Sequence, residues 1–330
     1  MRKGSLRLPL LGLALALVAA VSLFLGRYPS PGLSSIGEIF RDPLAARLIL
    51  SLRLPRIIAG LLLGATLAAA GTVFQMIFAN PLVEPGFLGV SQGAGFGAAL
   101  CIVALTASPA AVQAVALVFA LAGLAFSWVL ARAFRFGGWI LRLVLAGIAV
   151  SSLFSAGIGA LKLAADPARQ LPEITFWLLG GLWSVTWGDI WYLLPPVGAG
   201  LAVVTALRWK LNVLSLDDRV AHSLGTAPDR ERLVLLLAAT VATAAAVSVS
   251  GLVGWIGLMV PHAARRLVGT DARTALPAGM LLGALVVLVC DDIARTALPA
   301  EIPLGILTSL VGAIGFVVLM STAGRRRRGA

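Results

Sequence analysis

The sequence predicts an all-α membrane protein with about ten transmembrane helices, formed as one domain over residues 1–330. Hydrophobic residues make up 59% of the chain, charged residues make up only 12%, and the mean hydropathy is +0.99. Soluble proteins have about 25% charged residues, so this chain would leave too much apolar surface in water. The apolar stretches are continuous and lack the period-two alternation of a transmembrane β-barrel, which indicates helices.

Ten stretches are apolar enough to cross a bilayer, which takes roughly 20 helical residues. The first could be a signal peptide, but it is longer than a signal core and no A-x-A cleavage pattern follows it, so we interpret it as a span. The last three are short or contain proline, which leaves their ends the least well defined. The predicted spans are residues 8–26, 57–79, 87–106, 110–131, 143–161, 189–207, 233–250, 252–268, 275–290 and 303–320.

The distribution of positive charge orients these spans. An even number of spans places both termini on one side of the membrane. With both termini in the cytoplasm, 18 of the 26 Lys and Arg residues lie inside, as the positive-inside rule requires. The basic run Arg325–Arg328 is explained by anionic lipid at the membrane surface and requires no nucleic acid.

Most basic residues on the outer side fall within one segment. Two interpretations are open: the side chains reach the lipid headgroups, or they form a basic surface for an acidic partner. The residues concerned are Arg27, Arg41, Arg47, Arg53 and Arg56.

Glycines recur along two of the predicted spans, where they allow helices to approach closely. They are Gly60, Gly64 and Gly71 in the second span and Gly89, Gly93 and Gly97 in the third.

Several chemistries are disfavoured. Cys101 and Cys290 lie in apolar runs typical of buried small side chains, and His222 and His262 lie far apart. No cluster of His, Cys and carboxylates has metal-ligand spacing. The chain also has no G-x-x-x-x-G-K-[ST] phosphate-binding loop, so any ATP hydrolysis requires another polypeptide.

The cytoplasmic loop 208–232 is the longest polar segment on the inner side. Within it, residues 214–225 are predicted to form a short helix with Ser215 as N-cap and Gly225 as C-cap. Its apolar side chains share one face and could rest on the membrane or dock a soluble partner. These side chains are Leu216, Val220 and Leu224.

Eight motifs between Leu52 and Met320 resemble, in order and spacing, the FecCD family of permeases. This family forms the membrane subunits of type II ABC importers of ferric siderophores, haem, cobalamin and molybdate. The motifs are Leu52–Arg56, Asn80–Ala94, Leu145–Gly147, Phe176–Gly181, Leu214–Gly225, Gly257–His262, Asp292–Arg295 and Glu301–Gly305.

The resemblance implies an architecture and a set of partners. Two copies of the chain would pair in the bacterial inner membrane, with the path along the dimer axis. Two cytoplasmic ABC ATPase subunits would bind ATP and Mg, and a periplasmic or lipid-anchored binding protein would cap the dimer. The chain itself would hold no cofactor and would not be an enzyme.

The resemblance also implies roles for particular residues. Binding-protein docking falls on Arg53, Arg56 and Arg295. The cytoplasmic gate falls on Asn80, Leu82, Ile140 and Leu141. ATPase coupling falls on Leu216, Asp218, Ala221, Leu224 and Gly225.

Four positions depart from the family pattern. Asp217 stands where a small residue is common, and His222 stands where Arg is common; either change could tune the ATPase contact. Ile140 and Leu141 are apolar where the cobalamin importer has polar residues, which counts against cobalamin as the substrate.

An iron chelate, either a ferric siderophore or haem, is the first expectation for the substrate. The alternatives are cobalamin or molybdate through the same kind of importer, or an ion-coupled secondary transporter. The outer residues Lys162 and Arg169 favour an anionic cargo, although both also suit lipid headgroups.

The carboxylates bear on the remaining alternatives. Glu84, Asp189, Asp291 and Glu301 lie near the ends of predicted spans, which leaves no clear intramembrane proton relay. The Asp291-Asp292 pair could serve a membrane enzyme that acts on a metal-bound phosphate. Without a second acidic cluster, however, a structural or docking role is favoured for this pair.

Overall fold

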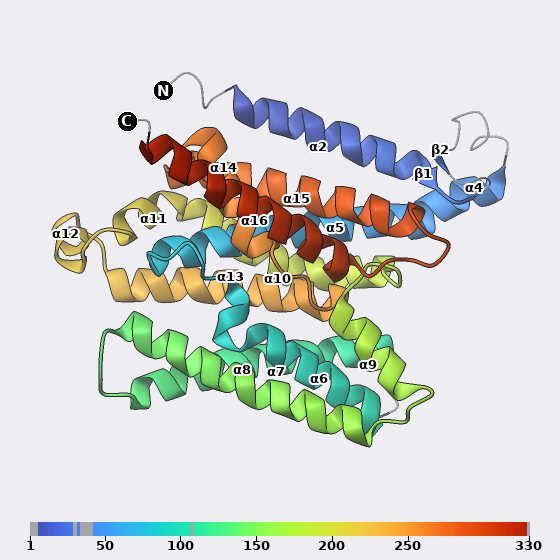
Figure 1. Ribbon diagram of the computed structural model, residues 1–330, viewed down its shortest axis with the longest axis horizontal. Helices are drawn as coiled ribbons and strands as arrows, with labels where there is room; N and C mark the ends of the chain where they lie inside the picture. The colour runs from blue at the N-terminus through green and yellow to red at the C-terminus, as the bar shows by residue number, and fades with distance from the viewer. Residues whose placement is uncertain (1–5, 29–31, 34–41, 106–107, 329–330) are drawn as a thin grey trace.

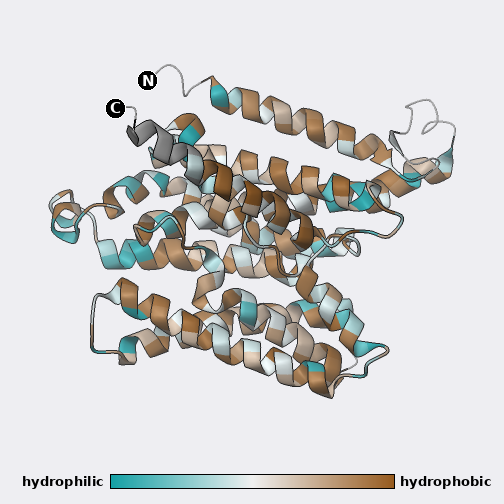
Figure 2. Ribbon diagram, in the orientation of Figure 1, coloured by the Kyte–Doolittle hydropathy of each residue, from teal (hydrophilic) through white to brown (hydrophobic). Residues whose placement is uncertain are grey.

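Long helices lie side by side along the length of the molecule (Figure 1), with hydrophobic residues in the middle and hydrophilic residues gathered toward the two ends (Figure 2). This computed structural model describes residues 6–28, 32–33, 42–105 and 108–328; Arg41 lies outside these ranges. The predicted all-α membrane fold is confirmed. α2 begins and α16 ends at the left end in Figure 1, and we call this the cytoplasmic end, after the orientation predicted from the distribution of positive charge.

All ten predicted spans coincide with helices. Seven helical segments are long and apolar enough to cross a membrane, whereas α6, α14 and the apolar part of α16 are shorter. The helices are α2 (Arg7–Phe24), α5 (Leu54–Ile77), α6 (Val90–Leu105), α7 (Pro109–Ala133), α8 (Trp139–Ala164), α10 (Trp187–Ala206), α13 (Pro228–Ser250), α14 (Ile256–Val268), α15 (Ala272–Thr296) and α16 (Leu304–Arg328).

The second span begins earlier than its predicted start at residue 57. The Asp42 carboxylate caps α4 (Pro43–Leu48) by accepting a hydrogen bond from the Leu44 backbone N–H. The π-helical segment η1 (Ile49–Arg53) then continues without a break into α5. Proline at the first helical position needs no backbone donor, so Pro43 starts this long helix without interrupting it.

Two spans begin later than predicted because residues with positive φ directly precede them. The 3₁₀ turn η2 (Pro85–Leu88) ends at Gly89, which has a φ of 80°, and α6 starts only at Val90. Trp255, which has a φ of 71°, directly precedes α14, which starts only at residue 256. Glycine adopts this left-handed region without the steric cost of a Cβ atom.

Several short elements lie outside the predicted spans. The helix α9 (Gln170–Leu179) was not predicted. The helices α11 (Arg208–Leu214) and α12 (Asp218–Ser223) form the cytoplasmic loop. The strands β1 (Leu25–Gly26) and β2 (Gly32–Leu33) pair antiparallel at the outer end.

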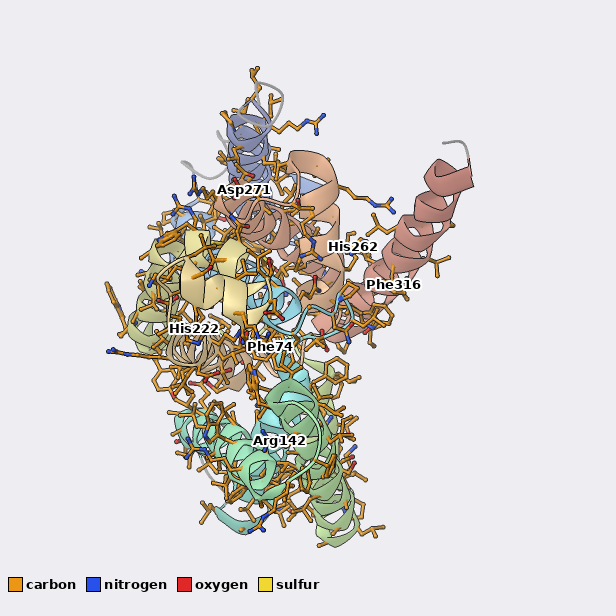
Figure 3. The ribbon with its side chains drawn as sticks, turned by 90° about the vertical axis from the view of Figure 1, so that its left-hand side faces the viewer. Phe74, Arg142, His222, His262, Asp271 and Phe316 are labelled. Atoms are coloured by element: carbon orange, nitrogen blue, oxygen red, sulfur yellow. The ribbon has the colours of Figure 1, made fainter. Side chains whose placement is uncertain are left out.

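The helices form two packed groups. In the larger, α15 packs on α5, α14 and α2, and α13 packs on α5 and α10. In the smaller, α6, α7 and α8 pack on one another and join the larger group through α13. Figure 3 shows the two groups from the cytoplasmic end, with α16 leaning away to one side.

Glycines bring helix backbones into direct contact, as predicted. A Cβ atom added to Gly64 of α5 would lie 2.2 Å from the Gly283 carbonyl oxygen of α15. One added to Gly71 would lie 1.9 Å from the Gly257 carbonyl oxygen of α14, and one added to Gly93 would lie 2.3 Å from a carbonyl oxygen of α7. Real atoms do not approach so closely, so these positions require glycine.

Cys101 and Cys290 are unpaired and buried, also as predicted.

We predict that Gly71→Ala destabilises the protein because the new methyl group collides with backbone that cannot rotate away. Overpacking of this kind costs about 1–3 kcal/mol or more. The thermal unfolding temperature in detergent should fall clearly. The control is Gly198→Ala on α10, where an added Cβ atom meets nothing within 4 Å, and this variant should unfold like the unaltered protein. Equal unfolding temperatures for both variants would contradict the close contact between α5 and α14.

Candidate functional site

A buried ion pair joins α5 to α15 near the outer end. The Arg56 guanidinium donates to both carboxylate oxygens of Asp291, with Nε–Oδ2 and Nη2–Oδ1 distances of 2.9 Å. Asp291 is fully buried and Arg56 is 9% exposed. Arg56 Nη1 also pairs with the partly exposed Glu301 at 3.0 Å. Because an unpaired buried charge is strongly destabilising, this pairing holds α5, α15 and the segment before α16 together.

A second polar set joins α2 to α15. Asp292 accepts hydrogen bonds from Arg295 and from the Ser22 hydroxyl. Arg295 Nη2 donates to the Ser22 carbonyl oxygen at 2.6 Å, and all three residues are buried. The acidic pair Asp291-Asp292 therefore has a structural role, which is one of the two roles favoured by its sequence.

The arginines expected to dock the binding protein, Arg53, Arg56 and Arg295, all bind partners within the chain. Arg56 and Arg295 are buried and paired within the chain. Arg53 is half-buried and donates to the carbonyl oxygens of Leu23 and Tyr28, each at 3.0 Å. Carboxylates from α15 lie within reach of two of these arginines, and burial favours pairing with them over exposure. Sequence reasoning missed Glu301 as a partner of Arg56.

Asn80 and Leu82 lie in a tight turn after α5 at the cytoplasmic end. Ala79 has a φ of 47°, and the Asn80 backbone N–H donates to the Gln75 carbonyl oxygen at 3.1 Å. The Asn80 Oδ1 atom accepts from the Leu82 backbone N–H at 2.9 Å. An asparagine that bonds its own backbone in this way stabilises a turn, and Leu82 remains 51% exposed.

The two segments expected to form the gate lie side by side within the chain. Ile140 and Leu141 begin α8 directly after Trp139. The Trp139 ring lies against the Phe78 ring, with a centroid distance of 6.1 Å, and Phe78 leads into the Asn80 turn. Leu141 is 50% exposed.

The short cytoplasmic helix α12 begins later than predicted. The N-cap is Asp217 and not Ser215: the Asp217 carboxylate accepts from the Arg219 backbone N–H at 2.9 Å. Ser215 still belongs to the end of α11, where its hydroxyl donates to the Asn212 carbonyl oxygen at 2.8 Å. The extra turn between Ser215 and Asp217 shortens α12 to six residues.

The two sides of α12 differ in exposure. Ala221 is fully buried, and Gly225, with a φ of 79°, follows the end of the helix. The apolar side chains of Leu216, Val220 and Leu224 are 47%, 46% and 59% exposed. Together they form an apolar face that the described part of the chain leaves uncovered.

Arg232 connects α12 to the start of α8. Its buried side chain pairs with Asp218 through Nη1 at 2.7 Å and donates to the Leu214 carbonyl oxygen through Nη2 at 2.9 Å. Its guanidinium carbon lies 6.0 Å from the centroid of the Trp139 ring, within cation–π range. Sequence reasoning missed Arg232, because a charged residue near the start of a helix ordinarily contacts solvent.

The segment before α12 is anchored to the start of α15. The Asn212 amide donates to Asp271 Oδ1 at 2.7 Å and accepts from the Ala272 backbone N–H at 2.9 Å. The backbone N–H of Arg273, followed by the Asn212 amide, lowers the pKa of Asp271 below its ordinary value. Asp271 therefore remains ionised at neutral pH and holds α11 in place.

Glu84 lies inside the bundle and not at the end of a span. With Ser91, Thr243 and Gly257 it lines a cavity of about 190 Å³. None of the other described residues around this cavity is titratable, so the cavity contains no chain of carboxylates for ion coupling. Among the described residues, no group of three or more His, Cys, Asp or Glu side chains could hold a metal ion.

Membrane-spanning helices with a short helix exposed at one end are the arrangement expected of a permease, the membrane subunit of an ABC importer. The chain belongs to the FecCD transport family, whose model matches residues 14–322.

Two curated relatives and one solved structure are similar over most of the chain. The molybdate import system permease protein MolB of Haemophilus influenzae is 37% identical over 94% of each chain. The Fe(3+) dicitrate transport system permease protein FecC of Escherichia coli is 41% identical over 75% of this chain and 74% of the relative. The structure, a metal-chelate type ABC transporter in an inward-facing conformation, aligns with a TM-score of 0.88 and 36% identity over 96% of this chain and 98% of that chain.

We predict a non-additive response when the Arg56–Asp291 pair is altered. Asp291→Asn alone leaves a buried arginine without its main partner and should cost about 3–5 kcal/mol. The double variant Arg56→Met with Asp291→Leu removes both charges and should be clearly more stable than Arg56→Met alone or Asp291→Leu alone. Thermal unfolding in detergent measures this, with exposed Arg47→Met as the neutral control. Additive losses in the double variant would show that the two residues stabilise the fold independently.

Proposed function

We propose that the chain forms the path for import of an iron chelate, a ferric siderophore or haem, along the axis of a homodimer in the bacterial inner membrane. A separate ATPase binds ATP and Mg and drives transport. The observation that carries the proposal is α12, whose exposed apolar face lies at the cytoplasmic end of a FecCD family permease.

An uncovered apolar helix supports pairing with a second copy. α16 leans away from the bundle (Figure 3), and several of its large side chains are 39–66% exposed. A face of this kind is suited to packing against another helix within the membrane. The residues are Ile306, Leu310, Val311, Ile314 and Val317.

The ATPase acts on the permease through α12 in this proposal. Leu216 and Leu224 enter a groove on the ATPase, while Asp218 passes the displacement to Arg232. Arg232 lies against Trp139, and Trp139 lies against Phe78. Movement of α12 is thereby connected to both gate segments, which contain Asn80 and Leu82 in one and Ile140 and Leu141 in the other.

We assign docking of the binding protein to the arginines that remain accessible at the outer end, which are fewer than the resemblance implies. Arg53, half-buried, and Arg47, exposed, are available at the outer end of the helix that contains α4 and α5. Arg56 and Arg295 lie beneath this surface and stabilise it through their buried ion pairs with Asp291 and Asp292. Arginine suits the role because its guanidinium can hold a carboxylate of the partner with two hydrogen bonds.

The substrate assignment rests on charge and on relatives. Lys162 and Arg169 are near the outer end of α8 and form no ion pair among the described residues, which favours an anionic cargo. The metal-chelate and Fe(3+) dicitrate relatives favour an iron chelate. Molybdate is the second candidate, because the relative named for it matches 94% of the chain.

We predict that Leu216→Asp with Leu224→Asp releases the ATPase or uncouples ATP hydrolysis from transport. Burying one leucine contributes roughly 1.5–3 kcal/mol, and the double variant replaces two such contacts with charge. Copurification of the ATPase and transport in proteoliposomes measure the effect. The control is Leu6→Asp, which alters a side chain that is 68% exposed next to the start of α2, outside the α12 segment. Normal assembly and transport in the double variant would remove the coupling role of α12.

We predict that cells lacking this chain lose uptake of a radiolabelled ferric chelate, while molybdate uptake persists. In the Lys162→Glu, Arg169→Glu double variant, uptake of an anionic chelate should slow, because the charge at the outer mouth is reversed. Loss of molybdate uptake alone would assign the transporter to the second candidate. Unchanged uptake of both substrates would contradict the proposed cargo classes.

A further inference from the structure

The cytoplasmic end contains a cleft of about 570 Å³ that is lined neither by α12 nor by the expected gate residues. It lies where the end of α7 meets the starts of α8 and α13, between the two helix groups seen in Figure 3, where Arg142 is labelled. The lining residues are Trp128, Ala131, Arg132, Trp139, Arg142, Leu143, Asp229, Arg230 and Leu233.

Positive charge predominates in this cleft. Arg132, Arg142 and Arg230 face a single carboxylate, Asp229. None of the three arginines forms an ion pair among the described residues. Arg142 donates to the Phe134 carbonyl oxygen at 2.9 Å, and its Nε atom is buried without a hydrogen-bond partner. The cleft therefore offers several unused donors to an anion, and guanidinium groups match phosphate oxygens well.

The rest of the cleft wall is apolar and continues into the membrane. Trp128, Ala131, Leu143 and Leu233 lie among the arginines. Leu237 follows Leu233 by one helical turn on the same side of α13 and is 42% exposed. A free anion needs no such apolar strip, whereas an acyl chain does.

The depth of the cleft matches the lipid headgroups. Arg142 and Arg230 lie in the first turns of α8 and α13, and Arg132 lies in the last turn of α7. Trp128 lies one turn deeper, with the Arg132 guanidinium carbon 5.5 Å from its ring centroid. Tryptophan and arginine gather in this way at the cytoplasmic membrane interface.

We propose that this cleft binds one anionic phospholipid, with the headgroup phosphate between Arg132, Arg142 and Arg230 and an acyl chain along Leu233 and Leu237. Basic pockets between helices on the cytoplasmic side are suited to such lipids. The bound lipid joins the start of α8 to the start of α13. It thereby braces Trp139, which directly precedes the gate residues of α8 and contacts Arg232.

The test measures the thermal unfolding temperature of the full-length protein in detergent with added lipid. Phosphatidylglycerol should raise this temperature, whereas phosphatidylcholine and inorganic phosphate should not. Arg132→Gln with Arg142→Gln should weaken phosphatidylglycerol binding by on the order of tenfold or more, because charge-assisted hydrogen bonds are lost. If the double variant folds poorly, Arg230→Gln, at an exposed position, tests the site instead, and it should also reduce the stabilisation by phosphatidylglycerol. Native mass spectrometry should detect one retained lipid per chain.

The matched control is Arg135→Gln with Arg273→Gln, which removes the same charge from exposed cytoplasmic positions outside the cleft. The control should retain the full response to phosphatidylglycerol. Equal loss in both double variants would show unspecific attraction and overturn the site. An equal response to phosphatidylcholine or to inorganic phosphate would overturn the anionic lipid as the ligand. If the Arg132→Gln, Arg142→Gln variant kept its response to phosphatidylglycerol but no longer copurified with the ATPase, the cleft would be a contact with protein and not a lipid site.

Discussion

The ion pair between Arg56 and Asp291 is the interaction on which the rest of the packing depends, because it secures α5 against α15. The helices α2 and α14 pack on α15, while α10 and α13 pack on α5, so the central pair positions all four. Paired glycines set the separation of the two backbones at Gly64 and Gly283, and the ion pair aligns them near the outer end. Within a bilayer neither charge has water as an alternative partner.

The two ends of the protein differ in how they satisfy polar groups. At the outer end, Arg56 and Arg295 are buried with carboxylates of α15, which makes this end a closed set of internal contacts. At the cytoplasmic end, Arg232 links α12 to α8 while the apolar face of α12 stays open. In the proposed transport cycle, the ATPase pushes on α12 at the cytoplasmic end. The helices then move while the buried ion pairs at the outer end keep them aligned.

The spans could be predicted because apolar length is a property of neighbouring residues. The break at Gly89, inside a predicted span, could not, because tertiary contacts select its left-handed backbone; a Cβ atom added there would lie 2.9 Å from the Val150 side chain. The exposed face of α12 followed from its own pattern of leucines. The pairing of Arg56 with Asp291 did not, because it joins residues 235 positions apart, and no local rule selects one carboxylate among several.

The two native cysteines have a practical consequence for spectroscopy. Cys101 and Cys290 are 0% and 2% exposed, and thiol reagents modify accessible thiolates. Spin labels or fluorophores can therefore be attached to single cysteines introduced on α12, α16 or the gate turns, with the natural thiols left in place. In the proposed homodimer, distances between labels on the two copies would then record the opening and closing of the path directly, in a protein whose native packing is unaltered.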